Sequence, residues 1–351
     1  MNSTAIPNGN RTSSLLPCSD LITPPLSHYW LEVDPVTTAL IITSFFEAII
    51  TLMLFGVCVH FITLYVSSRL RASRLLWLCG IFPVYSTVSC IGMVVPRSMP
   101  ISDGLVILYI SRCMFEYVDL VMHCLGEDKG AKEKVDKFKL NTAPCCCCCP
   151  CIPHLEPTTR NFKIFRMLVY QIAFVRPLVT YISMVLWVDR WGDFDPSAPW
   201  KPFLSSIVIA STLLAIYGVN VIHEAAKHHL YKFKMHVAMA FMQIMLLIYN
   251  VQGPLFGLCG GLLSCEEQLL PDYAKASLWH HLLVVLECFI MLALAMWFCR
   301  PSVNEMFDRY HRVTQSDGGN SQSDAPQEAV VCSRLQRFDD DDTQVFCATA
   351  L

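Results

Sequence analysis

Six ionisable residues interrupt the long apolar stretches of this sequence, where a charge is costly. They are Glu47, Arg112, Glu116, Asp119, Arg176 and Glu287. At the centre of a bilayer each costs about 2.5–3.5 kcal/mol on insertion scales, so such residues pair with one another or line a polar cavity. Their chemistry is therefore that of holding an ionic or polar solute, or of holding the protein together.

The densest group lies between residues 112 and 123. At 100° per residue its members fall within an arc of about 60° on one helical face; they are Arg112, Glu116, Asp119 and His123. The rest of this helix is aliphatic and aromatic, so the charged face must turn into a helix bundle or a wet cavity. Two interpretations remain open, a set of structural ion pairs and a polar path for a solute.

Further polar residues recur on single faces of other apolar segments. Three such sets stand out: Ser44, Glu47 and Thr51; Gln243 and Asn250; His280 and Glu287. Arg176, followed by Pro177, is a natural anchor for a carboxylate or sulfate, because guanidinium binds planar or multidentate oxyanions. Intramembrane acids outnumber bases four to two, which predicts that some acids are paired, protonated or turned towards a missing helix.

A run of six cysteines forms a second candidate site, and its residues are Cys145, Cys146, Cys147, Cys148, Cys149 and Cys151. Its loop is expected on the cytosolic side, where a reducing environment disfavours disulfides. Cysteines beside a membrane are good acceptors for S-palmitoylation, and several acyl chains would pin the loop to the lipid. Zinc binding and unmodified thiols are the alternatives, although adjacent thiolates do not easily surround a tetrahedral ion.

The composition shows which elements position these residues. Hydrophobic residues make up 54% of the 351 and charged residues only 16%, against about 25% charged in soluble domains. The apolar residues form blocks of roughly 20, the length that spans a bilayer as a helix. We predict an all-α polytopic membrane protein with seven transmembrane helices, at about 36–66, 75–95, 104–125, 162–188, 203–223, 235–263 and 278–299, and a kink at Gly253-Pro254.

The distribution of Lys and Arg predicts the orientation. With the amino terminus outside, 18 lie on the cytosolic side and five outside, which follows the positive-inside rule. Glycosylation sequons at Asn2 and Asn10 agree with this topology. The predicted organisation is an extracellular segment 1–35, a helical domain 36–299 with a cytosolic cysteine-rich loop 126–161, and a disordered cytosolic tail 300–351. The last residues, Thr349 to Leu351, fit a PDZ domain.

Several functional classes are disfavoured by missing motifs. The chain lacks the D/E-R-Y, C-W-x-P and N-P-x-x-Y patterns of G-protein-coupled receptors, but a seven-span signalling receptor remains the alternative to a transporter. No nucleophile elbow, P-loop or dinucleotide fingerprint occurs, so we expect no enzyme activity and no cofactor. No metal centre is expected, and no basic stripe predicts nucleic-acid binding.

The cysteine run and its flanks, Ala143 to Cys151, resemble the cysteine-rich loop of the organic solute transporter alpha subunit family. Weaker similarities extend over about residues 36–299, at Val95–Ser98, Tyr170–Phe174, Phe194–Pro196, Ser211–Ala215, Phe241–Gln243 and His281–Leu283 with Glu287. The resemblance implies a seven-helix subunit that pairs with a single-span beta subunit.

It also implies facilitated, sodium-independent and bidirectional transport of bile acids, conjugated steroids and related amphipathic organic anions. The implied location is the basolateral plasma membrane of epithelia, surrounded by membrane lipids, with retention in the endoplasmic reticulum when the partner is missing. The eight residues expected along the solute path are Glu47, Arg112, Glu116, Asp119, Arg176, Gln243, Asn250 and Glu287.

Overall fold

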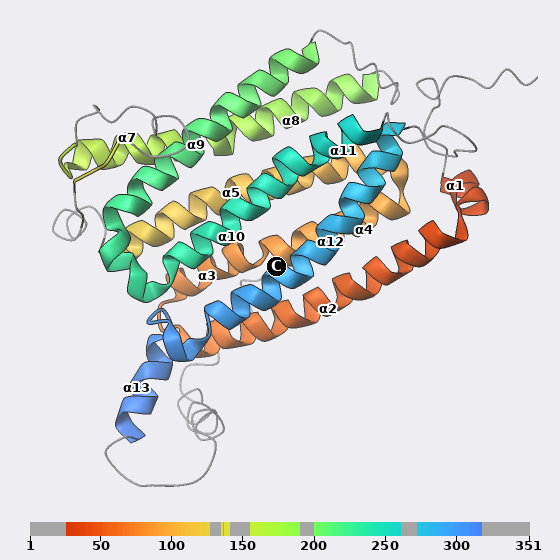
Figure 1. The fold of residues 1–351 in the computed structure, drawn as a ribbon. Coiled ribbons are helices and arrows are strands. Elements are labelled where there is room, and N and C mark those ends of the chain that lie inside the picture. Colours follow the sequence, from red (N-terminus) through yellow and green to blue (C-terminus); the bar gives the residue numbers. More distant parts are fainter. Residues whose placement is uncertain are drawn as a thin grey trace, which may run out of the picture.

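The structure is a computed structural model, and it describes residues 26–126, 135, 137–140, 155–189, 200–260 and 272–317. Nearly all of these residues are helical, which confirms the predicted all-α class. The elements form an elongated bundle (Figure 1). Within the described ranges, the one β pairing is an isolated bridge between Phe138 and Leu155.

The first long helix begins where the sequence predicts. After a short α1 (Leu26–Glu32), α2 spans Pro35–Tyr65. Asp34 caps it, because its side chain accepts from the backbone N–H groups of Val36 and Thr37 at 3.0 and 3.2 Å. Proline in the first turn fits the same start, since its missing N–H is not needed there.

The second apolar segment is longer than predicted. It consists of α3 (Arg69–Cys79) and α4 (Ile81–Val94), which join at Gly80. A Cβ on Gly80 would lie 2.3 Å from the hydroxyl oxygen of Tyr109, so glycine allows α5 to approach closely. The predicted second span begins at about residue 75, but α3 already begins at Arg69, so Arg71 and Arg74 lie on a helix and pair with acidic residues.

A 3₁₀ turn, η2 (Pro96–Ser98), leads into α5 (Met99–Leu125), which ends at Gly126 with φ 86°, a left-handed conformation suited to glycine. The next segment is split into α7 (Thr159–Tyr170) and α8 (Ile172–Asp189), and α9 follows at Trp200–Leu230. A 3₁₀ turn, η3 (Tyr231–Phe233), connects α9 to α10.

The sixth segment contains the predicted irregularity, although one turn earlier than expected. It consists of α10 (Met235–Leu247), a π-helical turn η4 (Ile248–Gln252) and α11 (Gly253–Gly260). Proline has no N–H to donate, so a wider turn before Pro254 accommodates the lost hydrogen bond and the helix continues through it. The last long helix is α12 (Asp272–Phe298), followed by η5 (Pro301–Val303) and α13 (Asp308–Asp317).

Six of the helical segments are long and apolar enough to cross a membrane: 35–65, 69–94, 159–186, 202–233, 235–256 and 274–298. The predicted third span, α5, is not among them, and it carries Asp103, Arg112, Glu116 and Asp119. It is also the central helix, packed against α3, α4, α7, α8, α9 and α10. Its charged face is therefore covered by protein on several sides.

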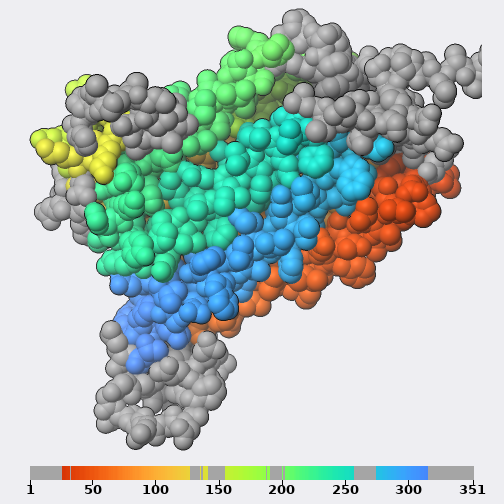
Figure 2. All heavy atoms as spheres, in the orientation of Figure 1, coloured from red at the N-terminus to blue at the C-terminus, as the bar shows by residue number. Residues whose placement is uncertain are grey.

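The other helices surround α5 in two groups. On one side, α7 and α8 pack against α9; on the other, α12 packs against α2 and α4. Figure 2 shows α12 as a band between α2 and the α10–α11 segment. The ends of α2, α9 and α12 and the starts of α3 and α7 meet at one end of the bundle, here called the basic end because it carries Arg74, Lys232 and Arg300.

Two predicted boundaries need correction. The tail was predicted to be disordered from residue 300, but the chain is helical to residue 317 and Phe307 is buried. Asp308 explains this attachment, because it accepts hydrogen bonds from Ser67 and Arg71. Likewise, the predicted polar amino-terminal segment contains α1, whose Tyr29 is fully buried.

The cysteine-rich loop is attached to the bundle on both sides of the cysteines. Phe138 and Leu155 exchange backbone hydrogen bonds at 2.8 and 3.0 Å, and the buried Phe138 ring packs against Phe162 and Phe165. The cysteine run itself lies outside the described residues, as do Asn2, Asn10 and the carboxy-terminal Thr349–Leu351.

Candidate functional site: buried charges of the helix bundle

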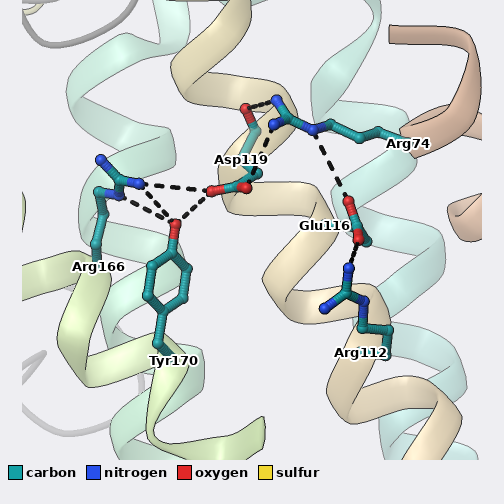
Figure 3. Close-up of polar contacts among 6 residues, drawn as sticks. All are labelled: Arg74, Arg112, Glu116, Asp119, Arg166 and Tyr170. Atoms are coloured by element: carbon teal, nitrogen blue, oxygen red, sulfur yellow. Dashed lines mark hydrogen bonds and ion pairs between the residues drawn. The ribbon is translucent and has the colours of Figure 1, made fainter. Parts of the chain in front are cut away.

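The charged face of α5 forms an ion-pair network with two neighbouring helices (Figure 3). Its members are Arg112, Glu116 and Asp119 from α5, Arg74 from α3, and Arg166 and Tyr170 from α7. We call this set the α5 network. It lies towards the basic end of the bundle and connects α3, α5 and α7.

Asp119 is the most heavily bonded acid of the α5 network. Its carboxylate lies 3.3 Å from Nη2 of Arg74 and 3.7 Å from Nη2 of Arg166. It also accepts a short hydrogen bond from the hydroxyl of Tyr170, and Nη1 of Arg74 donates to its backbone carbonyl at 2.5 Å. Both carboxylate oxygens are thus occupied by donors from other helices.

Glu116 completes the α5 network on the other side. It accepts a short hydrogen bond from Arg112 one turn earlier, and Nε of Arg74 lies 3.8 Å from its second oxygen. The Glu116 side chain is only 7% exposed, whereas Arg112 is 47% exposed and lies 4.7 Å from the centre of the Phe115 ring. The pairing of Arg112 with Glu116 along one helix is the structural alternative raised from the sequence.

The α5 network corrects the predicted acid surplus. Three guanidinium groups face two carboxylates, so this region carries net positive charge. Two arginines that are absent from the predicted set account for this charge, Arg74 and Arg166. The sequence signal was present, because Arg166 lies within the predicted span 162–188 and Arg74 lies directly before the predicted span 75–95.

Arg176 has a different environment. It is 1% exposed in α8, and within the described part of the chain no carboxylate lies within ion-pair distance of it. One nitrogen, Nη2, makes a short hydrogen bond to Thr212 of α9 and a 3.0 Å hydrogen bond to Oδ1 of Asn250 in the π-helical turn. Its Nε is buried without a hydrogen-bond partner.

Other uncharged polar groups surround Arg176. The hydroxyl of Tyr85, in the neighbourhood of Arg176, is buried and has no hydrogen-bond partner among the described residues. Five residues before Arg176, Gln171 at the junction of α7 and α8 exchanges two hydrogen bonds of 2.7 Å with Ser211 of α9. Of the predicted site residues, the structure therefore brings Arg176 and Asn250 together. Thr212 and Tyr85 belong to the same group, but no local sequence pattern marks them.

A separate polar cluster lies where α4, α5, α12 and the π-helical turn meet. Asp103 accepts a 2.8 Å hydrogen bond from Tyr249 and lies 3.7 Å from Nε2 of His281, whose Nδ1 is 3.2 Å from the Ser89 hydroxyl. His280 stacks edge-on against Tyr249. Asp103 was absent from the predicted set because it lies before the expected start of the third span.

The remaining predicted residues lie apart from one another. Glu287 accepts a 3.1 Å hydrogen bond from Gln252, and Gln243 donates to Asn220 at 2.6 Å. Glu47 is half-buried in α2, and its carboxylate has no hydrogen-bond or ion-pair partner among the described residues. Ser44 and Thr51 on the same face donate to backbone carbonyls of their own helix. In the described ranges, no cluster of three potential metal ligands occurs.

A sequence model of the family described as "Organic solute transporter Ostalpha" matches residues 39–303 of this chain. The chain belongs to this family. The family resemblance of the cysteine run is thereby confirmed, and the membrane-spanning transporter class is favoured over an enzyme or a signalling receptor. The solute-transporter name also agrees with a bundle that holds buried charges among apolar helices.

Relatives in this family cover most of the chain at low identity. Organic solute transporter alpha-like protein 3 of Caenorhabditis elegans is 27% identical over 308 residues, covering 84% of this chain and 86% of its own. The human organic solute transporter subunit alpha is 27% identical over 315 residues, covering 83% and 87%. The zebrafish (Danio rerio) subunit alpha is 28% identical over 235 residues, covering 63% and 69%. No solved structure is significantly similar to this chain.

Proposed function

We propose that this chain is the alpha subunit of a heteromeric facilitative transporter for bile acids, conjugated steroids and related organic anions. Family membership supports the transporter role, and the relatives named "subunit alpha" support a partner chain. Arg176 is the observation that carries the anionic substrate class: a buried guanidinium with no carboxylate partner and an unpartnered Nε can accept an anion from outside the protein.

The proposed solute path runs past Arg176 between α8, α9 and the π-helical turn. Thr212 and Asn250 orient the guanidinium, because both bond to the same Nη2 and leave its other nitrogens for a substrate oxyanion. Glu47, Gln243 and Glu287 contribute polar groups elsewhere along the path. The α5 network has the different role of holding α3, α5 and α7 in place.

The proposed topology has seven spans: the six apolar helical segments and, in addition, α5, which comes third in chain order. Although α5 is more charged than the other spanning segments, it is long enough at 27 residues and is enclosed by six helices. The positive-inside rule places the basic end in the cytosol and the amino terminus outside, where Asn2 and Asn10 are available for glycosylation. A tag inserted before Asn2 should be accessible to antibody on intact cells, and a tag after Leu351 should not.

The test of the function is uptake in cells that lack related carriers. Radiolabelled taurocholate and a steroid sulfate should enter cells that express this chain together with a single-span beta subunit. Expressed alone, the chain should remain in the endoplasmic reticulum and give little flux. Full surface delivery and full uptake without a partner would contradict the heteromeric proposal, and no uptake with the partner would contradict the transporter proposal.

The proposed energetics are facilitated and sodium-independent. Flux should follow the substrate gradient in both directions, so preloaded cells should release taurocholate at a rate comparable to uptake. Replacing sodium by choline should leave both rates unchanged. In polarised epithelial monolayers, the protein should lie in the basolateral membrane, with the last residues, Thr349–Leu351, available to a PDZ domain.

The cysteine run is proposed to be S-palmitoylated. The attachment of Phe138 and Leu155 to α7 supports this, since it holds both ends of the loop near the basic end. One acyl chain binds a membrane only marginally and two or more bind firmly. Single Cys→Ala changes should thus be mild, and replacing all six should impair trafficking and abolish hydroxylamine-sensitive labelling. Unchanged labelling, or bound zinc instead, would contradict acylation.

A further inference from the structure

A space large enough for a solute lies at the basic end of the bundle, away from the polar cluster around Asp103. It is a cavity of about 380 Å³ between α2, α3, α4, α10 and α12, here called the end cavity. Its walls are mainly apolar, with aromatic and sulfur-containing side chains such as Phe82, Phe241, Met242 and Met296. This volume falls in the range of about 300–1,000 Å³ typical of small-molecule sites.

The charges of the end cavity have a single sign. Lys234 and Arg300 line it, and no aspartate or glutamate does. In the described part of the chain neither base forms an ion pair; Lys234 lies 5.5 Å from the Tyr231 ring centre and Arg300 lies 5.4 Å from that of Trp297. An apolar cavity with two unneutralised cations matches a ligand that has an apolar body and an anionic end.

The backbone at Lys234 supports a role for this side chain. Its φ of 52° lies in the left-handed region, and it is the one non-glycine residue with positive φ among those described. Glycine or asparagine would adopt this conformation more readily. Strained residues of this kind cluster at ligand sites.

The segment after α12 closes the end cavity. Pro301, Asn304, Phe307 and Tyr310 form part of its wall. Two attachments hold this segment: Asp308 bonds to Ser67 and Arg71, and the Glu305 carboxylate lies 3.2 Å from Nζ of Lys232. The wall therefore belongs to the same segment whose attachments order the chain beyond residue 300.

We propose that the end cavity binds an amphipathic organic anion, with its rigid apolar body among the α10 and α12 side chains and its anionic group at Lys234 and Arg300. This inference rests on the proposed function and adds a second binding site for the same substrate class. It is separate from Arg176, which does not line the cavity. The end cavity receives the solute at the basic end, and Arg176 binds it deeper in the bundle.

The test uses the full chain with its beta subunit in phosphatidylcholine nanodiscs and a diazirine-bearing steroid sulfate as the photoprobe. Cross-links should map to peptides of α10 and α12 that contain Met242 and Met296. The variant Lys234→Asn tolerates the left-handed backbone, and Arg300→Gln removes the charge but keeps a polar side chain. Each should raise the half-saturating probe concentration about tenfold, and the pair about hundredfold, as expected for hydrogen bonds to charged groups.

Controls separate this site from general effects of charge and from lipid binding. Lys227→Gln, an exposed base outside the cavity, should leave half-saturation unchanged. A neutral steroid photoprobe should label the wild type weakly and the double variant equally weakly. Labelling confined to other helices, equal affinity for the neutral probe, or displacement by phosphatidylserine but not by steroid sulfate would each overturn the inference.

The result also separates this inference from the proposed function. If cells take up steroid sulfate but the end cavity is not labelled, the cavity inference fails and the transporter proposal stands. If the wild type shows neither uptake nor labelling, the proposed function fails as well. Labelling of the cavity with the expected charge dependence supports both.

Discussion

The bundle holds its arginines in two contrasting environments. In the α5 network, Arg74, Arg112 and Arg166 face the carboxylates of Glu116 and Asp119, with ion-pair distances up to 3.8 Å. Arg176, by contrast, is more deeply buried, and among the described residues its hydrogen bonds go only to neutral oxygens. The network joins three helices, whereas Arg176 leaves hydrogen-bonding capacity unused.

This difference separates charges that stabilise the fold from charges that are available to a solute. Removing one member of a buried ion pair is destabilising, because its partner stays buried and uncompensated. An unpaired buried charge already carries that cost, so removing it relieves the protein. Mutations in the two environments should therefore change stability in opposite directions.

The largest effect is expected from Asp119→Asn. It leaves Arg74 and Arg166 without their shared carboxylate, at a cost of about 3–5 kcal/mol in the free energy of unfolding. The variant should give little monodisperse protein after detergent extraction and a clearly lower unfolding temperature. Glu224→Gln is the matched control, because Glu224 pairs only with exposed lysines. Equal stability of both variants would contradict the structural role of the α5 network.

The second-largest effect is expected from Arg176→Gln. Uptake of taurocholate and steroid sulfate should fall about hundredfold, equivalent to ~2.7 kcal/mol, because the proposed anion anchor is lost. The unfolding temperature should stay the same or rise, since the unpaired charge is gone. Arg176→Lys should retain part of the activity. A variant that unfolds like Asp119→Asn would place Arg176 with the structural charges instead.

The substitution Asn250→Asp would give the guanidinium of Arg176 a carboxylate partner. Oδ1 of Asn250 lies 3.0 Å from Nη2 of Arg176, so a carboxylate of the same shape would neutralise the guanidinium. We expect a tenfold or larger loss of anion uptake at unchanged surface expression. Asn250→Ala, which removes the hydrogen bond but adds no charge, is the control and should reduce uptake less. The reverse order would argue against anion binding by Arg176.

The smallest effect is expected where pairing is partly exposed, at Asp308. Burial raises the pKa of its carboxyl, but hydrogen bonds from Ser67 and the charge of Arg71 outweigh this and hold the pKa below its ordinary value. Because its pKa is lowered, the ionised carboxylate of Asp308 stabilises the attachment fully at pH values above the ordinary pKa of an aspartate. This contribution is lost only as the pH falls through the lowered pKa. The stability of the attachment should therefore stay constant between pH 5 and 8.

Asp308→Asn should weaken this attachment by about 1 kcal/mol or less. Tryptic cleavage at Arg309 and Arg312 should then be up to about fivefold faster than in the wild type, as that energy permits. Glu305→Gln provides a comparison, because its pair with Lys232 is more exposed and should matter less. Cleavage that accelerates already between pH 7 and 6 would contradict the assignment to Asp308.

Much of the helical layout could be predicted from sequence, because apolar blocks of bilayer length have few alternatives. The 3.6-residue period of residues 112–119 also predicted that their charged side chains turn inward; Glu116 and Asp119 do so, whereas Arg112 is 47% exposed. The partners were not predictable in the same way, since Arg74 and Arg166 belong to helices that are distant in sequence. Pairing across helices depends on packing, which a single periodicity does not encode.

The end cavity and the wall after α12 illustrate the same limit. Residues 300–317 are polar on average, with a composition typical of disorder, but the buried Met306 and Phe307 and the well-bonded Asp308 attach them to the bundle. The two unpaired cations of the cavity were counted in the sequence only as evidence for a cytosolic side. Their shared apolar surroundings come from α10 and α12, which only the fold brings together.

The π-helical turn at Ile248–Gln252 makes consecutive residues face different neighbours. Tyr249 bonds to Asp103 of α5, Asn250 to Arg176 of α8, and Gln252 to Glu287 of α12. A π turn holds one residue more than an α turn, so deleting one residue here would restore a regular α-helix and remove the wide turn that gives these three side chains their separate directions. An insertion or deletion at this turn would therefore disturb all three contacts together, whereas a substitution would change one of them at a time.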